Sequence, residues 1–246
     1  MKAMIFSAGL GTRLKPFTDK QPKALALVNE KSLLQRNILF LASFGIKDII
    51  INVHHFAQEV INVIKANEGF GSNIAISDES RQLLETGGGL EKASWYFDDG
   101  EPFIVMNVDI LTDMDIRLLV KDHLENRPLA TLAVTDRITS RYFLFDESGN
   151  LCGWKNEHTG EQKMSREIKT CTQKAFSGIH IISPEIFALM QNLAPHYSNY
   201  PKFSLVQFYL ELAKTHVIKY FDHSNTKFID VGKPASIAEA ELLFTT

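Results

Sequence analysis

The stretch that decides the fold is residues 2–28, which read KAMIFSAGLGTRLKPFTDKQPKALALV. It opens with the short apolar run Ala3–Phe6, which has the length and flanks expected of a buried strand. Small residues follow from Ser7 to Thr12, and they leave the backbone uncovered. Because bare amide groups at the carboxyl end of a strand favour negative charge, this turn is typical of an anion site.

Positive charge follows the small residues directly. Residues 11–23 contain one acid, Asp19, and four cations, namely Arg13, Lys15, Lys20 and Lys23. The ligand that this arrangement favours is a phosphate chain. A P-loop is excluded because no Gly-x-x-x-x-Gly-Lys-Ser/Thr run follows Gly9, and the dinucleotide fingerprint is excluded because position 14 is Leu. The two glycines alone are equally typical of a tight strand-to-loop turn.

Composition limits the class of protein. The chain has 246 residues, 45% hydrophobic and 22% charged, which is typical of a soluble globular protein. A net charge of −3 argues against a general nucleic-acid partner. Cys152 and Cys171 are the only cysteines, and we expect both to be reduced. No apolar run reaches the length of a signal or spanning segment, so we expect a cytoplasmic protein without a membrane partner.

Apolar periodicity predicts alternating strands and helices. Strands are expected at 3–6, 46–53, 73–77, 103–106, 129–134, twice within 141–155, and at 176–182, 217–221 and 227–229. Helices are expected at 33–44, 57–68, 90–96, 114–124, 184–192, 204–214 and 235–244. The opening β-α-β-α-β order implies a parallel sheet with right-handed crossovers. The polar segment 156–172 is interpreted as a long loop over a binding site or a mobile excursion, and residues 1–246 as one continuous domain.

Acidic residues end two of the predicted strands. Asp109 closes the run Asn107–Asp109, and Asp230 follows the strand 227–229. Ligands of open parallel sheets bind outside the carboxyl ends of the strands. Either acid alone could simply cap a turn or a helix. Together with a phosphate loop they favour a shared Mg²⁺, which is typically held by one or two carboxylates, phosphate and water.

The string Gly-x-Gly-Thr-Arg-Leu-x-Pro-x-Thr from Gly9 to Thr18, followed by Pro22-Lys23, resembles the sugar-phosphate nucleotidyltransferases, or nucleoside-diphosphate-sugar pyrophosphorylases. Four further stretches are similar to the branch that uridylylates N-acetylmuramate-1-phosphate, namely 84–89, 176–179, 203–205, and 229–232 with 238–241. The resemblance covers nearly the whole chain and is weakest over 137–173. It implies an α/β fold with a Rossmann-like, mixed but mostly parallel sheet flanked by helices (GT-A-like). Residues 1–135 would mainly bind nucleotide and 136–230 mainly sugar phosphate.

The resemblance also implies a reaction and a set of roles. A sugar-1-phosphate oxygen would attack the α-phosphate of a nucleoside triphosphate, with UTP as the expected donor, Mg²⁺ as cofactor and pyrophosphate as leaving group. Arg13 and Lys23 would act at the phosphates. The remaining contacts would come, for the nucleotide, from Ala8, Gly9, Gly11, Thr12, Arg13, Glu85, Thr86 and Gly87; for the sugar, from Asn107, Asn156 and Gly178; and for the metal, from Asp109 and Asp230.

Several positions depart from the family pattern or leave alternatives open. Val108 and Lys233 stand where the family usually has Gly and Thr. Arg141 and Lys174 could each pair with a carboxylate of the sugar, or could be solvated strand cations. His54 and His55 could bind metal or shape the base pocket. A cytidylyl-, guanylyl- or adenylyltransferase for phosphocholine or a hexose or heptose phosphate, and a nucleotide-sugar sensor, remain alternatives. The chain is expected to be a monomer or a small homo-oligomer.

Overall fold

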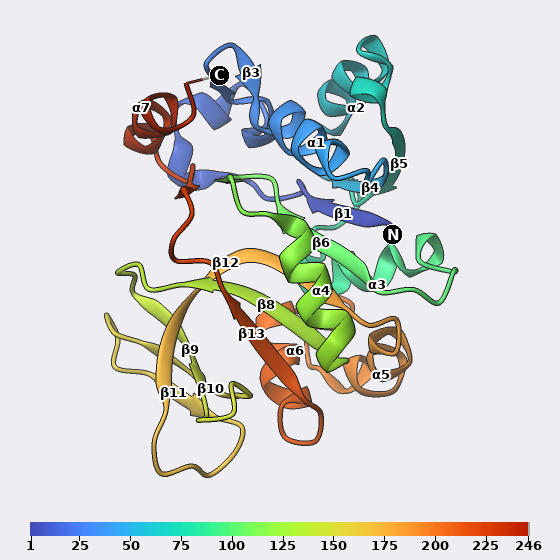
Figure 1. Cartoon of the computed structure of the whole chain (residues 1–246). Coiled ribbons are helices and arrows are strands. Elements are labelled where there is room, and N and C mark those ends of the chain that lie inside the picture. Colours follow the sequence, from blue (N-terminus) through green and yellow to red (C-terminus); the bar gives the residue numbers. More distant parts are fainter. Residues whose placement is uncertain (246) are drawn as a thin grey trace.

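A ten-stranded sheet crosses the whole molecule in the computed structural model, which describes residues 1–245 (Figure 1). Its main path runs through β11 (Gln162–Met164), β10 (Leu151–Asn156), β9 (Arg141–Phe145), β12 (Thr172–Ile182), β6 (Phe103–Asn107), β1 (Ala3–Phe6), β4 (Asp48–Val53) and β5 (Asn73–Asp78). Off this path, β8 (Ala130–Thr135) pairs with β12 and with β13 (Ile218–Asp222).

The half of the sheet formed by β6, β1, β4 and β5 is entirely parallel. Ile5 of β1 lies between Ile51 of β4 and Met106 of β6. Of these strands, β1, β4 and β6 are largely apolar and buried, because helices cover both of their faces. Their carboxyl ends lie at the same edge of the sheet, where β1 ends at Phe6 opposite Asn107. This edge is where the sequence predicts the ligand.

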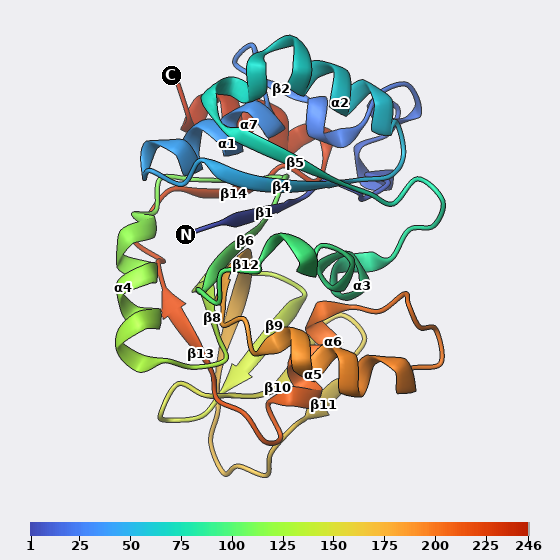
Figure 2. The same cartoon turned by 90° about the vertical axis from the view of Figure 1, so that its right-hand side faces the viewer.

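Residues 1–245 contain seven α-helices that cover the sheet, and Figure 2 shows α1 and α2 on one side of β4 and β5 with α3 on the other. One hydrophobic cluster joins the sheet to α1 (Leu33–Ser43), α2 (Ala57–Ala66), α4 (Ile116–Asn126) and α7 (Pro234–Leu243). A second cluster joins it to α3 (Glu85–Lys92), α5 (Ile186–Leu193) and α6 (Leu205–Leu212). Two short antiparallel pairs complete the described chain, β2 (Leu27–Val28) with β3 (Lys31–Ser32) and β7 (Ile110–Thr112) with β14 (Phe228–Asp230).

The other half of the sheet is mostly antiparallel. The long strand β12 runs antiparallel to β6, β8 and β9, and β9, β10 and β11 form a meander at the far edge. The register of β12 shifts between Phe176 and His180, where Gly178 has a φ of 72°. This bulge turns β12 from its pairing with β6 toward its pairing with β9.

The α/β class and the mixed, mostly parallel core are confirmed, and two expectations are wrong. The helix expected at 90–96 begins at Glu85 and contains all three glycines. Glycine is needed inside this helix because a Cβ on Gly88 would lie 2.1 Å from the Pro201 carbonyl oxygen. The segment 156–172 is not all loop, since it holds the edge strand β11. The three residues of β11 are exposed, so they carry no apolar signal. Both cysteines are free thiols. Within residues 1–245, no helix is long and apolar enough to cross a membrane.

Candidate active site

The loop that follows β1 forms the floor of a pocket of about 280 Å³. Gly11 takes a left-handed conformation with φ 62° and precedes a short 3₁₀ turn, Thr12–Leu14. The Gly11 carbonyl accepts hydrogen bonds from the Leu14 N–H at 2.8 Å and the Thr18 hydroxyl at 3.0 Å. A Cβ on Gly11 would lie 2.8 Å from the Thr18 side chain, so both conformation and space require glycine there.

Most of the predicted phosphate and nucleotide residues meet at this pocket. Its wall contains, among the predicted residues, Gly9, Gly11, Thr12, Arg13, Lys23, Thr86, Asn107 and Asp109. Ala8 is buried within the loop and does not line the pocket. Lys23 forms an ion pair with Asp109, and both side chains are largely buried. The loop therefore presents backbone to the pocket, while the paired lysine and aspartate lie together in its wall.

Asp109 and Asp230 are neighbours although they lie 121 positions apart in the sequence. Strand β14 pairs with β7 so that Asp230 lies opposite Ile110, and the Val231 N–H donates to the Asp109 carbonyl at 2.8 Å. Burial, followed by the charge of Asp109, raises the pKa of Asp230 above its ordinary value. Arg13 Nη2 lies 3.9 Å from Asp230 Oδ2.

This pair of carboxylates fits a divalent cation. Asp230 Oδ1 is buried and has no hydrogen-bond partner among residues 1–245. A buried carboxylate oxygen without a partner is costly unless a ligand or ion satisfies it. No group of three or more His, Cys, Asp or Glu side chains gathers anywhere in the described chain. Two carboxylates suit Mg²⁺, which usually takes its other oxygens from phosphate and water.

A buried hydrogen-bond chain supports the phosphate loop from behind, and the sequence analysis missed it. The Ser7 N–H donates to Asn52 Oδ1 at 2.7 Å, and Asn52 Nδ2 donates to Glu79 Oε1 at 2.7 Å. Glu79 Oε2 accepts the Leu84 N–H at 3.0 Å. Glu79 is fully buried, and this burial raises its pKa despite the hydrogen bonds it accepts. One acid thus links the start of the phosphate loop to the start of α3.

The one sequence signal for this series of hydrogen bonds was a polar residue inside an apolar run. Asn52 interrupts the buried apolar run of β4 that follows Asp48, and it is 2% exposed. Gly89 has a matching role, since a Cβ there would lie 2.7 Å from Glu79 Oε1. His54 Nδ1 lies 2.7 Å from the Glu79 carbonyl oxygen and does not line the phosphate pocket.

The residues predicted to contact the base and ribose lie at the start of α3. Thr86 reaches the phosphate pocket, and its hydroxyl also accepts the Leu205 N–H at 3.0 Å. The Gly87 N–H donates to the Phe203 carbonyl at 2.9 Å, so this amide is engaged within the protein. Glu85 lies 3.6 Å from Lys202 and lines a different pocket. Of the three, the structure brings Thr86 to the phosphate loop.

A second cavity, of about 620 Å³, adjoins the first through Arg13, which is the one described residue that lines both. Charged side chains dominate its wall, with one acid, Asp230, and four cations, Arg13, Arg137, Arg141 and Lys233. Aromatic side chains supply the apolar part, namely Tyr142, Phe143, Trp154 and Phe176. The cavity is therefore suited to an anionic ligand with an apolar or sugar face.

Of the three predicted sugar residues, Asn107 and Gly178 lie together and Asn156 lies apart from them. Asn107 lines the phosphate pocket, and Gly178 lies directly behind it, because a Cβ on Gly178 would be 2.7 Å from Asn107 Nδ2. Asn156 lines neither cavity, and its Oδ1 accepts the His158 N–H at 3.0 Å in a surface turn. Gly178 therefore makes room for Asn107 in this structure.

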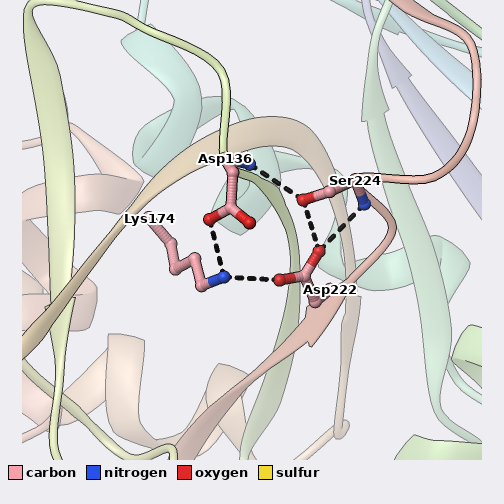
Figure 3. Close-up of polar contacts among 4 residues, drawn as sticks. All are labelled: Asp136, Lys174, Asp222 and Ser224. Atoms are coloured by element: carbon pink, nitrogen blue, oxygen red, sulfur yellow. Dashed lines mark hydrogen bonds and ion pairs between the residues drawn. The ribbon is translucent and has the colours of Figure 1, made fainter.

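Lys174 lines neither cavity, and it lies between two protein carboxylates (Figure 3), so neither alternative considered for it, a sugar carboxylate or a solvated strand cation, describes it. Its Nζ lies 2.7 Å from Asp136 Oδ1 and 2.5 Å from Asp222 Oδ2. Its side chain is 11% exposed, so it is not a solvated strand cation either. Lys174 is therefore already paired with two protein carboxylates. Arg141, in contrast, lies exposed at the start of β9 and lines the second cavity.

Known proteins are similar to this chain in sequence and in fold. A model of the nucleotidyl transferase family matches residues 2–246. A UTP–glucose-1-phosphate uridylyltransferase of Synechocystis is 32% identical over 202 residues, which cover 76% of this chain and 50% of that protein. An N-acetylmuramate alpha-1-phosphate uridylyltransferase of Neisseria meningitidis is 29% identical over 187 residues, 76% of this chain and 77% of that one. The match thus spans only half the length of the glucose-1-phosphate enzyme.

A solved structure matches over the full length of both chains. The crystal structure of HddC from Yersinia pseudotuberculosis, complexed with GMP-PN, has a TM-score of 0.75 and 25% identity. The match covers 99% of this chain and 99% of that one. The similarity therefore includes the antiparallel half of the sheet, where the sequence resemblance is weakest.

Proposed function

The chain belongs to the nucleotidyl transferase family, and we propose that it transfers a nucleotidyl group from a nucleoside triphosphate to a sugar-1-phosphate. The products are a nucleoside-diphosphate sugar and pyrophosphate. We propose UTP as the donor because two of the relatives described above are uridylyltransferases. N-acetylmuramate-1-phosphate is the first acceptor to test, because it is the substrate named for one of them.

One observation carries this proposal: two cavities meet at Arg13, beside a pair of acidic residues. The first cavity has a glycine-rich floor suited to a triphosphate. The second is lined by cations and aromatic rings, which suit a phosphorylated sugar. A phosphate of each ligand would reach the same arginine, and this is the geometry that phosphoryl-group chemistry between two substrates requires.

The reaction needs no protein base. A sugar-1-phosphate is already a dianion near neutral pH, because the second pKa of a phosphate monoester is about 6. One of its oxygens attacks the α-phosphorus in line, forming a new P–O bond, while the bond from the α-phosphorus to the bridging oxygen of pyrophosphate breaks. The electron pair of that bond leaves on pyrophosphate. Arg13, Lys23 and the loop amides hold and neutralise the phosphates.

Asp109 and Asp230 would hold Mg²⁺, which when bound supplies positive charge to the phosphates of both substrates. Lys23, paired with Asp109, keeps a cation at the same edge of the pocket. Trp154 and Phe143 in the wall of the second cavity would cover an apolar face of the acceptor. Arg141 would meet a carboxylate on the acceptor, such as the lactyl group of N-acetylmuramate-1-phosphate.

A guanine nucleotide is the second candidate donor. The full-length structural neighbour was solved with GMP-PN, and it spans the same two halves of the fold. The base would lie beyond Thr86, where no side chain in the sequence dictates one base over another. A donor panel must therefore include GTP beside UTP, CTP and ATP.

The test is pyrophosphate release with Mg²⁺, crossing these four triphosphates with N-acetylmuramate-1-phosphate, glucose-1-phosphate, mannose-1-phosphate and phosphocholine. We expect release with UTP and a sugar-1-phosphate. Release only with GTP would correct the donor and keep the reaction. Release only with phosphocholine would replace the acceptor class. If no pair releases pyrophosphate while UTP binds, a nucleotide-sugar sensor replaces the proposed transferase.

A further inference from the structure

Arg137 is a partly buried cation that forms no ion pair with a carboxylate of residues 1–245. It lies in the loop 136–140 between β8 and β9 and lines the second cavity. Its Nη2 donates to the Phe176 carbonyl at 2.6 Å, and its Cζ lies 4.9 Å from the centre of the Phe228 ring. Its Nε is buried without a hydrogen-bond partner among residues 1–245, and no ion pair within 4.0 Å involves it.

Asp230 is the acid whose charge acts on Arg137, and other cations share it. Burial lowers the pKa of Arg137, and Asp230 acts in the opposite direction. That carboxylate also interacts with Arg13 and Lys23. An arginine remains charged in proteins, so it needs an anion when water is removed from around it. The four cations against one acid in this cavity leave a place for a negatively charged ligand.

We propose that Arg137 binds the phosphate of the acceptor, the same phosphate whose oxygen attacks the nucleotide. This inference rests on the proposed function for the identity of the ligand. Arg13 lies at the junction of the two cavities, and Lys23 lies on the nucleotide side of it. Arg137 lies on the acceptor side only. A phosphate that enters through the second cavity therefore meets both Arg137 and Arg13, which line that cavity together with Asp230.

A cluster of ion pairs around the largely buried Lys174 fixes the loop that carries Arg137 (Figure 3). Its neighbour Asp136 pairs with Lys174 of β12, which also pairs with Asp222 at the end of β13. The Asp136 N–H donates to Ser224 Oγ at 2.9 Å, and Ser224 Oγ donates to Asp222 at 2.6 Å. Through Lys174, the cluster joins β12 and the end of β13 to Asp136, the residue just before Arg137. Lys174 is therefore a positioning residue for Arg137.

The first experiment compares Arg137→Met and Arg137→Lys with the wild type by isothermal titration of N-acetylmuramate-1-phosphate and, separately, glucose-1-phosphate. A non-hydrolysable UTP analogue and Mg²⁺ are present throughout. We expect Arg137→Met to weaken sugar-phosphate binding about 10- to 100-fold, the range for a hydrogen bond to a charged group. Arg137→Lys, which keeps the charge and loses the two-pronged geometry, should recover part of this loss. Affinity for the analogue should change less than about twofold.

Turnover separates this inference from the proposed function. In the reverse direction, Arg137→Met should raise KM for the nucleoside-diphosphate sugar and leave KM for pyrophosphate unchanged. A wild type that binds the sugar phosphate but never turns it over sinks the proposed function and leaves the titration to judge Arg137. Unchanged sugar-phosphate affinity in a folded Arg137→Met variant overturns the inference. So does an equal loss of affinity for nucleotide and sugar phosphate, or a wild type that binds neither sugar phosphate.

Lys174→Met tests the positioning role. We expect a loss of sugar-phosphate affinity of about 3- to 10-fold, and no additional loss when it is combined with Arg137→Met, because Lys174 acts through Arg137. Lys121→Met is the matched control, since it also removes a lysine from an ion pair, the exposed one with Glu125 on α4. Additive losses in the double variant would show that Lys174 only stabilises the fold, and would overturn its assigned role.

Discussion

The two cavities that meet at Arg13 are built by different means. The nucleotide-side cavity lies at the ends of parallel strands and presents mainly loop backbone, held from behind by Asn52 and Glu79. The acceptor-side cavity lies over the antiparallel strands and presents long cationic side chains and aromatic rings. Backbone amides cannot be exchanged by substitution, whereas side chains can. We therefore expect phosphate-loop chemistry to be fixed by the fold, and acceptor choice to be set by residues of the second half.

The largest expected effect lies at the junction, at Asp230. Asp230→Asn keeps the shape and removes the charge that would hold Mg²⁺. We expect kcat to fall about 10³-fold, or about 4 kcal/mol of transition-state stabilisation. Burial raises the pKa of Asp230, so loss of its charge should not lower the free energy of unfolding. Steady-state kinetics with UTP and a sugar-1-phosphate, beside urea unfolding, measures both.

The control for this prediction is Asp98→Asn, at an exposed aspartate that pairs with Lys2 far from both cavities. It removes an equal charge and should leave kcat unchanged. Chelation by EDTA should reproduce the Asp230→Asn loss in the wild type and be reversed by added Mg²⁺. A variant at Asp230 that keeps kcat within tenfold of wild type would remove this residue from the metal site and separate the two cavities functionally.

The next effect concerns the nucleotide side alone. Asn52→Leu leaves both the Ser7 N–H and Glu79 Oε1 buried without their partner. Unsatisfied buried groups cost 1–3 kcal/mol each and more when charged, so we expect a loss of about 3 kcal/mol in the free energy of unfolding. KM for UTP should rise while KM for the sugar phosphate stays constant. Asn62→Leu, on the exposed face of α2, is the control and should stay within about 0.5 kcal/mol of wild type.

The same contrast explains what the sequence could predict. The glycine-rich string and the acids at strand ends are local patterns, and they predicted the phosphate loop and the pairing of Asp109 with Asp230. The acceptor side depends on contacts between distant segments. Arg137, Lys174 and Asp222 each look like an ordinary polar residue until β8, β12 and β13 are aligned. The fully buried Glu79 was missed for a similar reason, because its side-chain partner Asn52 lies on another element, β4.

Acid should destabilise the fold through His180, which lies on β12 and hydrogen-bonds Tyr209 at 2.9 Å. Burial lowers its pKa to about 3. An unfolded histidine has a pKa of about 6.5, so below that pH the unfolded chain takes up a proton that the folded chain refuses, and stability falls as pH falls. Between pH 7 and pH 5 this single group should account for about 2 kcal/mol.

The double variant His180→Phe/Tyr209→Phe removes the titrating group and its partner together. Its free energy of unfolding should fall by about 2 kcal/mol less than that of the wild type when the pH goes from 7 to 5. Urea unfolding at the two pH values gives this difference directly, and any constant effect of the substitutions cancels. An equal fall in both proteins would mean that His180 is protonated in the folded state at pH 5.

The smallest effect sharpens the comparison most, because it separates folding from ligand contact within the phosphate loop. Gly11→Ala must adopt a φ of 62° and meets the Thr18 side chain, so we expect a loss of about 1–2 kcal/mol in the free energy of unfolding. A Cβ on Gly9 meets nothing within 4 Å, and its φ is not positive, so Gly9→Ala should fold with unchanged stability. KM for UTP in Gly9→Ala then reports the ligand alone. A raised KM at unchanged stability means that the triphosphate approaches the backbone at Gly9, and an unchanged KM means that the phosphates bind through Arg13 and Lys23 instead. In the second case the nucleotide side, like the acceptor side, would bind its ligand by side chains.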